Sequence, residues 1–171
     1  MTDLISVVDK YNDVHIESVC KNDADFLYGL MNIPSVLQVL NEIPTKRQDW
    51  VDAVNAWLSD DDEEDYIVFY KSAPIGWLGI NGLSCSDKSA YLKMAVFLPE
   101  YQGRGFGPFS IKQLISNLKS KGFEKVILYT DRDNHKAQSC YKKCGFQAVE
   151  SLTETMSNGK SISRVKMELV F

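Results

Sequence analysis

The segment from Pro99 to Phe109, P-E-Y-Q-G-R-G-F-G-P-F, places three glycines at alternate positions between an apolar β-type run and an apolar helical stripe. At Gly103, Gly105 and Gly107 no side chain prevents backbone N–H groups from approaching an anion closely. The helix expected to begin here adds the unpaired donors and the positive dipole end of its N-terminus. Pro108 suits the first turn of such a helix. This strand–turn–helix pattern predicts a site for phosphate or pyrophosphate.

Other phosphate motifs fit this turn less well. A dinucleotide-binding fingerprint that starts at Gly103 needs a glycine where Pro108 stands, and no acidic residue ends a suitable next strand. The G-K-S/T of a P-loop is absent from the turn. A nucleotide-binding domain of unrelated fold and a glycine-rich turn without any ligand remain as disfavoured alternatives.

The apolar periodicity along the chain predicts a mixed α/β domain over residues 1–171. Strands are predicted at residues 13–19, 66–70, 75–83, 90–98, 125–130, 147–156 and 162–171. Helices are predicted after Asn22 or Asp23, after Pro34, after Thr45 (as a cap), at residues 105–121 and at residues 134–144. The second, third and fourth strands have the pattern of an antiparallel meander, and Asn158-Gly159 favours a hairpin between the last two.

Composition and charge exclude several classes of protein. The 171 residues carry 19 Lys and Arg against 23 Asp and Glu, a formal charge of −4, which argues against a general nucleic-acid binder. No apolar stretch approaches the roughly 18–20 residues that span a membrane, and the first ten residues lack a secretory signal pattern. The four cysteines are irregularly spaced and are interpreted as reduced thiols, so we expect a cytoplasmic protein without membrane contact.

Two further clusters are interpreted from their composition. The six consecutive acids from Asp60 to Asp65 predict a solvated linker, because neighbouring like charges repel in a compact state. Attraction of a cationic substrate is the less favoured alternative. Trp50, Trp57 and Trp77 are expected in the core rather than as a cage for a quaternary amine.

Two motifs in order carry a family resemblance. Gln102 to Gly107 matches Q/R-x-x-G-x-G/A, and Asn134 to Phe146 matches N-x-x-A-x-x-x-Y-x-x-x-G-F. Together they resemble the GNAT superfamily of acyl-CoA-dependent N-acyltransferases. The segment D-A-D-F-L-Y-G-L-M-N-I-P-S-V is similar to its ribosomal-protein acetyltransferase branch. The resemblance implies a central, mostly antiparallel sheet flanked by helices, in which the strands at residues 90–98 and 125–130 form a splayed parallel pair.

The resemblance also implies roles for individual residues, with acetyl-CoA as cosubstrate. The implied cofactor-binding residues are Ala95, Val96, Phe97, Gln102, Gly103, Arg104, Gly105, Phe106, Gly107 and Asn134. Tyr141 is implied as the general acid that protonates the departing thiolate. Taken alone, Tyr141 would belong to an apolar helix stripe and Asn134 would be only a helix cap. No metal is expected, since Cys140 and Cys144 have no His or carboxylate at ligand spacing.

The general base is not assigned by the resemblance. Relatives that act on protein amines often carry a glutamate at the position of Tyr129, and a phenol with an ordinary pKa near 10 is a poor base at neutral pH. Asp131, Asp133, Glu100 and a chain of waters all remain candidates.

The sequence therefore predicts an N-acetyltransferase that acts by direct attack of a primary amine in a ternary complex. The amine belongs to a small molecule or a protein. The alternative is a non-catalytic acyl-CoA-binding or regulatory module of the same fold. By analogy with relatives, a homodimer through the C-terminal strands is a further expectation.

Overall fold

The computed structural model describes residues 11–171, so the expectation about a signal sequence in the first ten residues lies outside it. Within this range seven strands form one sheet in the order β1-β2-β3-β4-β5-β7-β6. The strands are β1 (Val14–Ser18), β2 (Glu63–Tyr70), β3 (Ala73–Asn81), β4 (Ser89–Phe97), β5 (Lys125–Asp131), β6 (Gln147–Thr155) and β7 (Ser161–Val170). The helices are η1 (Lys21–Asp23), α2 (Ala24–Met31), α3 (Pro34–Leu40), α4 (Arg47–Trp57), η2 (Pro99–Tyr101), α5 (Phe106–Ser120) and α6 (His135–Lys143). The predicted mixed α/β class and order of elements are confirmed.

The sheet is antiparallel except at its centre, where β4 and β5 run parallel. The pairing between these two strands ends at Tyr91 and Ile127, although β4 continues to Phe97 and β5 to Asp131. On their outer sides the two strands stay paired, β4 to β3 and β5 to β7. The halves of the sheet therefore diverge beyond Tyr91, as the predicted splay requires.

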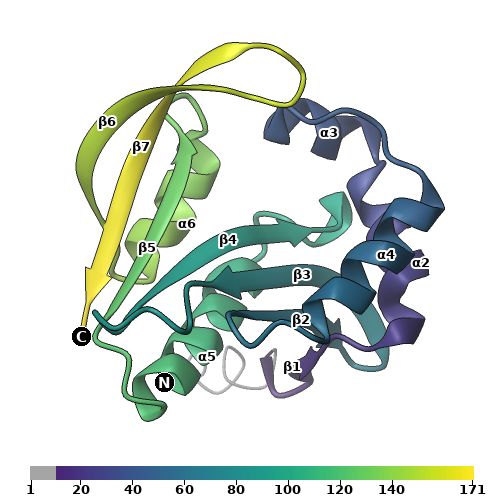
Figure 1. Ribbon diagram of the computed structural model, residues 1–171, viewed down its shortest axis with the longest axis horizontal. Coiled ribbons are helices and arrows are strands. Elements are labelled where there is room, and N and C mark those ends of the chain that lie inside the picture. The colour runs from purple at the N-terminus through teal and green to yellow at the C-terminus, as the bar shows by residue number, and fades with distance from the viewer. Residues whose placement is uncertain (1–10) are drawn as a thin grey trace, which may run out of the picture.

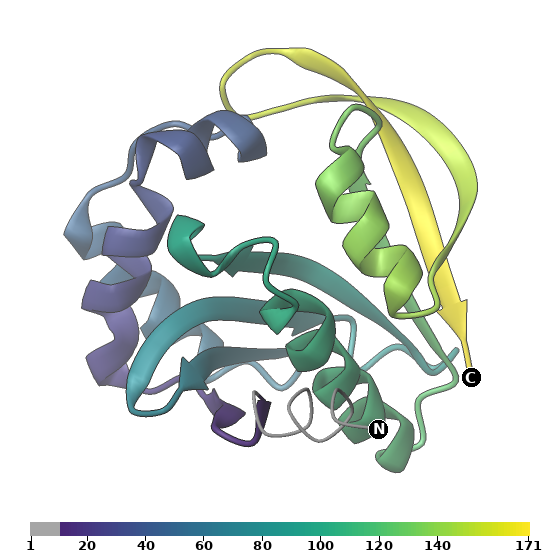
Figure 2. The same cartoon turned by 180° about the vertical axis from the view of Figure 1, so that it is seen from behind.

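Helices cover both faces of the sheet. In Figure 1, α4 lies on the near side of β2 and β3, with α2 next to it at the edge of the sheet, and in Figure 2, α5 and α6 lie on the opposite face. Two apolar clusters correspond to these faces. Leu27, Val54 and Ile67 belong to the cluster with α2 and α4, whereas Leu78 and Phe106 belong to the cluster with α5. No helix among residues 11–171 is both long and apolar enough to cross a membrane.

The prediction of a solvated linker at Asp60–Asp65 is wrong for its second half. Strand β2 begins at Glu63, and the side chain of Asp65 is only 1% exposed. The carboxylate is tolerated because it accepts a 2.7 Å hydrogen bond from Trp77 Nε1 and lies 3.2 Å from Lys93 Nζ. A buried charge needs such partners, and here tertiary structure supplies them.

Two details near α4 also bear on the sequence predictions. Lys46, not Thr45, is the N-cap of α4, and Thr45 Oγ1 instead accepts a 2.8 Å hydrogen bond from Trp50 Nε1. Trp50 and Trp77 are buried, which confirms that they belong to the core. Trp57 is half-buried and stacks on Trp77, with ring centroids 5.3 Å apart.

Candidate active site

The glycine turn lies directly beyond the splayed end of β4. Gly103 and Gly105 have φ angles of +67° and +89°, a left-handed conformation that favours glycine. Gly105 is the N-cap of α5, so the turn leads into the N-terminus of a 15-residue helix whose first turn contains no acidic residue. Backbone amides and a helix dipole thus meet at one point, which is the arrangement that binds phosphate.

Side chains of the turn hold its shape. Gln102 Nε2 donates a 2.8 Å hydrogen bond to the Phe97 carbonyl, which fixes the turn to the end of β4. Phe106 is fully buried, so only its backbone can face a ligand. The exposed Arg104 donates from Nη1 to the Glu100 carbonyl at 3.1 Å and keeps its charge beside the turn.

One residue at the turn is not found by the sequence prediction. The hydroxyl of Tyr11 donates a 3.0 Å hydrogen bond to the Arg104 carbonyl, and its ring stacks on Phe109 with centroids 4.8 Å apart. The hydroxyl also lies so close to Gly105 that a Cβ there would collide with it. Tyr11 is 93 residues from Arg104 in the sequence, and no local pattern could have linked them.

Helix α6 brings the second predicted motif against the first. Asn134 is its N-cap and accepts a 3.1 Å hydrogen bond from the Ala137 amide. The Cys140 sulfur lies 3.3 Å from the position that a Cβ on Gly107 would take, and Cys144 Sγ is 3.6 Å from the Pro108 carbonyl oxygen. The last two turns of α6 therefore pack against the start of α5.

Tyr141 lies on this packed face of α6 and is half-buried, edge-on to Phe146 with ring centroids 6.0 Å apart. Burial raises the pKa of its phenol, and the neighbouring thiols of Cys140 and Cys144 add to the rise. The side chain therefore keeps its proton at neutral pH. A general acid requires a protonated hydroxyl, so the pKa of Tyr141 agrees with that role. The packing of its ring agrees equally with the alternative, in which Tyr141 is only a core residue.

The three carboxylates considered as general bases differ in their surroundings. Glu100 and Asp133 are exposed, whereas the side chain of Asp131 is 20% exposed. Asp131 accepts a 2.8 Å hydrogen bond from Asn41 Nδ2 and lies 3.8 Å from Arg164 Nε. Burial raises the pKa of Asp131, and Arg164 and Asn41 oppose that rise.

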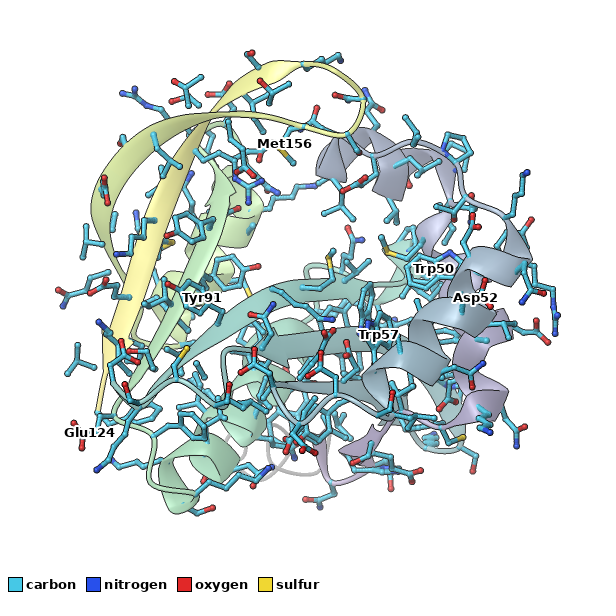
Figure 3. The ribbon with its side chains drawn as sticks, viewed as in Figure 1. Trp50, Asp52, Trp57, Tyr91, Glu124 and Met156 are labelled. Carbon is cyan, nitrogen blue, oxygen red and sulfur yellow. The ribbon has the colours of Figure 1, made fainter. Side chains whose placement is uncertain are left out.

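Tyr129 and Asp131 share one face of β5, since successive side chains of a strand point to opposite faces. Tyr129 stacks on Tyr91 of β4, with ring centroids 6.4 Å apart and planes within 9°. Tyr91 belongs to the last residue pair between β4 and β5, so the two rings lie where the splay begins. Figure 3 shows Tyr91 between these strands. The sequence prediction does not single out Tyr91.

The loop between β6 and β7 reaches across the molecule to the end of α3, an arch visible in Figure 1. The Asn158 amide and the Ser157 hydroxyl both donate to the Asn41 carbonyl, each at 3.3 Å. Asn41, held at φ +56°, thus joins three elements, because its side-chain amide also donates to Asp131. Among residues 11–171 no three His, Cys, Asp or Glu side chains gather as a metal site.

Known proteins similar to this chain agree on the family. The acetyltransferase (GNAT) family matches residues 33–146. The mycothiol acetyltransferase of Saccharomonospora viridis is 27% identical over 110 residues, which cover 62% of this chain and 34% of that protein. The ribosomal protein bS18-alanine N-acetyltransferase of Haemophilus influenzae is 38% identical over 64 residues, which cover 37% and 42%. The chain thus spans less than half the length of these two relatives.

Among solved structures, the spermidine N-acetyltransferase from Vibrio cholerae, in complex with CoA and spermine, has a TM-score of 0.84. The likeness covers 92% of this chain and 95% of that one at 22% sequence identity. At this identity the likeness shows the fold, and it confirms the predicted architecture.

Proposed function

Since the chain belongs to the acetyltransferase (GNAT) family, we propose that it transfers an acetyl group from acetyl-CoA to a primary amine by direct attack in a ternary complex. The observation that carries the proposal is the opening of the splayed strands β4 and β5 onto the glycine turn and the N-terminus of α5. The acetyltransferase names of the relatives support it.

The residues at the turn fit acetyl-CoA, which when bound supplies an acetyl group activated as a thioester. Gly103 and Gly105 hold the left-handed turn, and a Cβ at Gly103 would meet open space. The amides of residues 103–107 would hold the pyrophosphate, with the Arg104 charge beside them. The backbone of Ala95–Phe97 and the side-chain amide of Asn134 would hold the pantetheine arm.

Proton transfer would be divided between two residues of this chain. Tyr141 retains its proton and would give it to the departing thiolate, since burial raises the pKa of its phenol. Asp131 would accept the proton of the attacking ammonium, directly or through water. Among the three carboxylate candidates it combines partial burial with a raised pKa, which brings a carboxylate closer to the pH at which a base works best.

The test is thiol release from acetyl-CoA over a panel of amines, with Tyr141→Phe as the decisive variant. The variant keeps the ring packed on Phe146 and loses only the hydroxyl, so we expect kcat to fall about 10²–10⁴-fold. CoA should raise the melting temperature of both proteins equally. Tyr28→Phe, at an exposed tyrosine of α2, is the matched control and should keep full activity.

Three outcomes would contradict the proposal. Full activity of Tyr141→Phe would exclude the phenol as the acid. CoA binding without thiol release on any amine would favour the non-catalytic binding module. Absence of any stabilisation by CoA would contradict both functions, because a ligand that binds only the native state must stabilise it.

The setting of the activity follows from the same premise. We propose a single domain over residues 1–171 that acts in the cytoplasm on a small-molecule or protein amine, without nucleic acid or membrane. We further propose that it forms a homodimer through its C-terminal strands, because β6 is an edge strand and Val149 is 52% exposed on it. Light scattering at micromolar concentration tests the dimer.

A further inference from the structure

A lysine ammonium is held between two indole rings and two carboxylates on the α4 face of the sheet. Lys93 Nζ lies 4.4 Å from the ring centroid of Trp57 and 5.7 Å from that of Trp77. It also lies 3.2 Å from Asp65 Oδ2 and contacts the carboxylate of Glu63. Figure 3 shows Trp57 between α4 and the strands beneath it. We call these five residues the lysine cage.

A β-bulge in β4 directs the Lys93 side chain into the cage. The register between β3 and β4 shifts at Gly79, so Lys93 is the extra residue of a bulge. Its side chain crosses β3 over Gly79, where a Cβ would lie 2.5 Å from Lys93 Cε and 2.6 Å from Asp65 Oδ1. A side chain on Gly79 would therefore close the path that the lysine takes.

The rest of the cage is equally fixed. Trp77 Nε1 donates to Asp65 Oδ1 at 2.7 Å, and the two indole rings stack within 23° of parallel. Indole faces and carboxylates are the groups that bind ammonium ions in proteins. Without Lys93, the cage would be a binding site for an ammonium ion from outside the chain.

The cage lies close in sequence to the backbone of β4 that is proposed to hold acetyl-CoA. Lys93 is two residues from Ala95 on β4 and lies beyond Tyr91, where β4 and β5 diverge. The glycine turn leads into α5, which packs with α6 on the opposite face (Figure 2). If acetyl-CoA binds along the α5 face, as the proposed function requires, an amine that attacks in a ternary complex would approach from the α4 face.

Burial also opposes the entry of a second positive charge into the cage while Lys93 occupies it. Desolvation lowers the pKa of Lys93 to about 8 and raises the pKa of Asp65 to about 7. Both shifts show that charge at this place is poorly solvated. A second ammonium would therefore have to displace Lys93 rather than share the site with it.

We propose that Lys93 determines acceptor specificity: it fills the cage with the chain's own ammonium and so denies that place to the second ammonium of a diamine or polyamine. The inference rests on the proposed amine acetylation and names its substrate class. The enzyme favours acceptors with a single cationic centre, such as monoamines or amines next to neutral groups.

The experiment compares wild type with Lys93→Met, which keeps an unbranched side chain one atom shorter and removes the ammonium from the cage. Binding of spermidine to the CoA-loaded protein is measured by calorimetry, and kcat/KM is measured for butylamine, 1,4-diaminobutane and spermidine. Spermidine should bind Lys93→Met about tenfold more tightly than wild type, and the kcat/KM ratio of polyamine to monoamine should rise by about the same factor.

Two matched controls isolate the ammonium. Lys93→Arg keeps a cation in the cage and should keep the wild-type ratio. Lys121→Met also removes a lysine paired with a carboxylate of β2, but that partner is Glu64, and Lys121 is the C-cap residue of α5. Because side chains alternate along a strand, Glu64 faces away from the cage. Lys121→Met should therefore leave the ratio unchanged.

Several results would overturn the proposal. A folded Lys93→Met with unchanged spermidine affinity and ratio would do so, as would an equal gain in Lys121→Met. If Lys93→Met does not fold, the double variant Lys93→Met/Glu63→Gln is measured, because it also removes one of the two carboxylate charges of the cage. An unchanged spermidine affinity of the double variant would equally contradict the proposal. If no variant releases thiol with any amine, the proposed acetylation fails, and the calorimetric comparison still decides the role of Lys93.

Discussion

On the α5 side of the sheet, the glycine turn and the start of α5 offer backbone amides, whereas on the α4 side Glu63, Asp65 and Lys93 meet as side chains from β2 and β4. The first arrangement depends on φ angles and on the direction of one helix. The second depends on residues 28 positions apart being buried together. Substitutions should therefore act through backbone conformation on one face and through charge and desolvation on the other.

The largest expected effect concerns Asp65, because burial raises its pKa from the ordinary 3.8 to about 7 in the folded protein. A raised folded pKa means that its stabilising contribution is full below about pH 4 and is lost as the pH rises through about 7. Between pH 4 and pH 8, wild type should lose at most about 4 kcal/mol of unfolding free energy relative to Asp65→Asn. Urea unfolding of both proteins across this range measures the difference.

Asp62→Asn is the control from the same acidic run. Hydrogen bonds from Ser84 lower the pKa of Asp62, so its contribution is lost as the pH falls and not as it rises. Its stability should therefore run parallel to that of wild type between pH 5 and pH 8. If the unfolding free energies of wild type and Asp65→Asn change in parallel with pH, burial of the Asp65 charge does not destabilise the protein. The proposed difference between the two faces of the sheet would then be contradicted.

The contrast also explains how much of the molecule could be predicted from the sequence. The turn at Gly103–Gly107 and the cap at Asn134 are local, since their conformations depend on neighbours within a few residues. The elements around them could be predicted for the same reason. The prediction for the acidic run fails because a row of carboxylates gives no sign of which one is buried.

A signal for Asp65 did exist in the alternation of β2. Ile67 faces the α4 side, while Tyr66 and Val68 face the α5 side. Continuing that alternation backwards places Asp65 and Glu63 on the face of Ile67. The partners themselves could not have been found this way: Lys93 is 28 residues from Asp65, and Asn41 is 90 residues from Asp131.

A second prediction tests the backbone side with Gly105→Ala. The new Cβ would occupy a left-handed conformation at φ +89° and collide with the Tyr11 hydroxyl. Strain of about 1–3 kcal/mol at such a position would move the amides of the turn, so we expect CoA to bind about 30-fold more weakly. Calorimetric titration with CoA measures the loss.

Gly159→Ala provides the same backbone strain away from the glycine turn, because Gly159 has φ +82° and a Cβ there would meet no other atom within 4 Å. It should lower the melting temperature and leave CoA affinity unchanged. If both variants weaken CoA binding equally, the effect reflects general destabilisation, and the turn is not the phosphate site.

The smallest expected effect is on the side-chain side of the comparison, at Asn41. Asn41→Gly suits the left-handed φ of +56° and removes the amide that donates to Asp131. That hydrogen bond lowers the pKa of Asp131, so without it the pKa rises further. If Asp131 accepts the amine proton, the acidic limb of kcat/KM moves to higher pH, and kcat/KM near neutral pH falls about threefold.

The control for Asn41→Gly is Ser157→Ala, which removes a different bond to Asn41, the one from the hydroxyl to its carbonyl. Because the side-chain amide of Asn41 still donates to Asp131, the acidic limb should stay in place. CoA affinity should be unchanged in both variants, since neither residue touches the glycine turn in the contacts described for residues 11–171. An acidic limb that stays fixed in Asn41→Gly would remove Asp131 as the base and leave proton transfer to water.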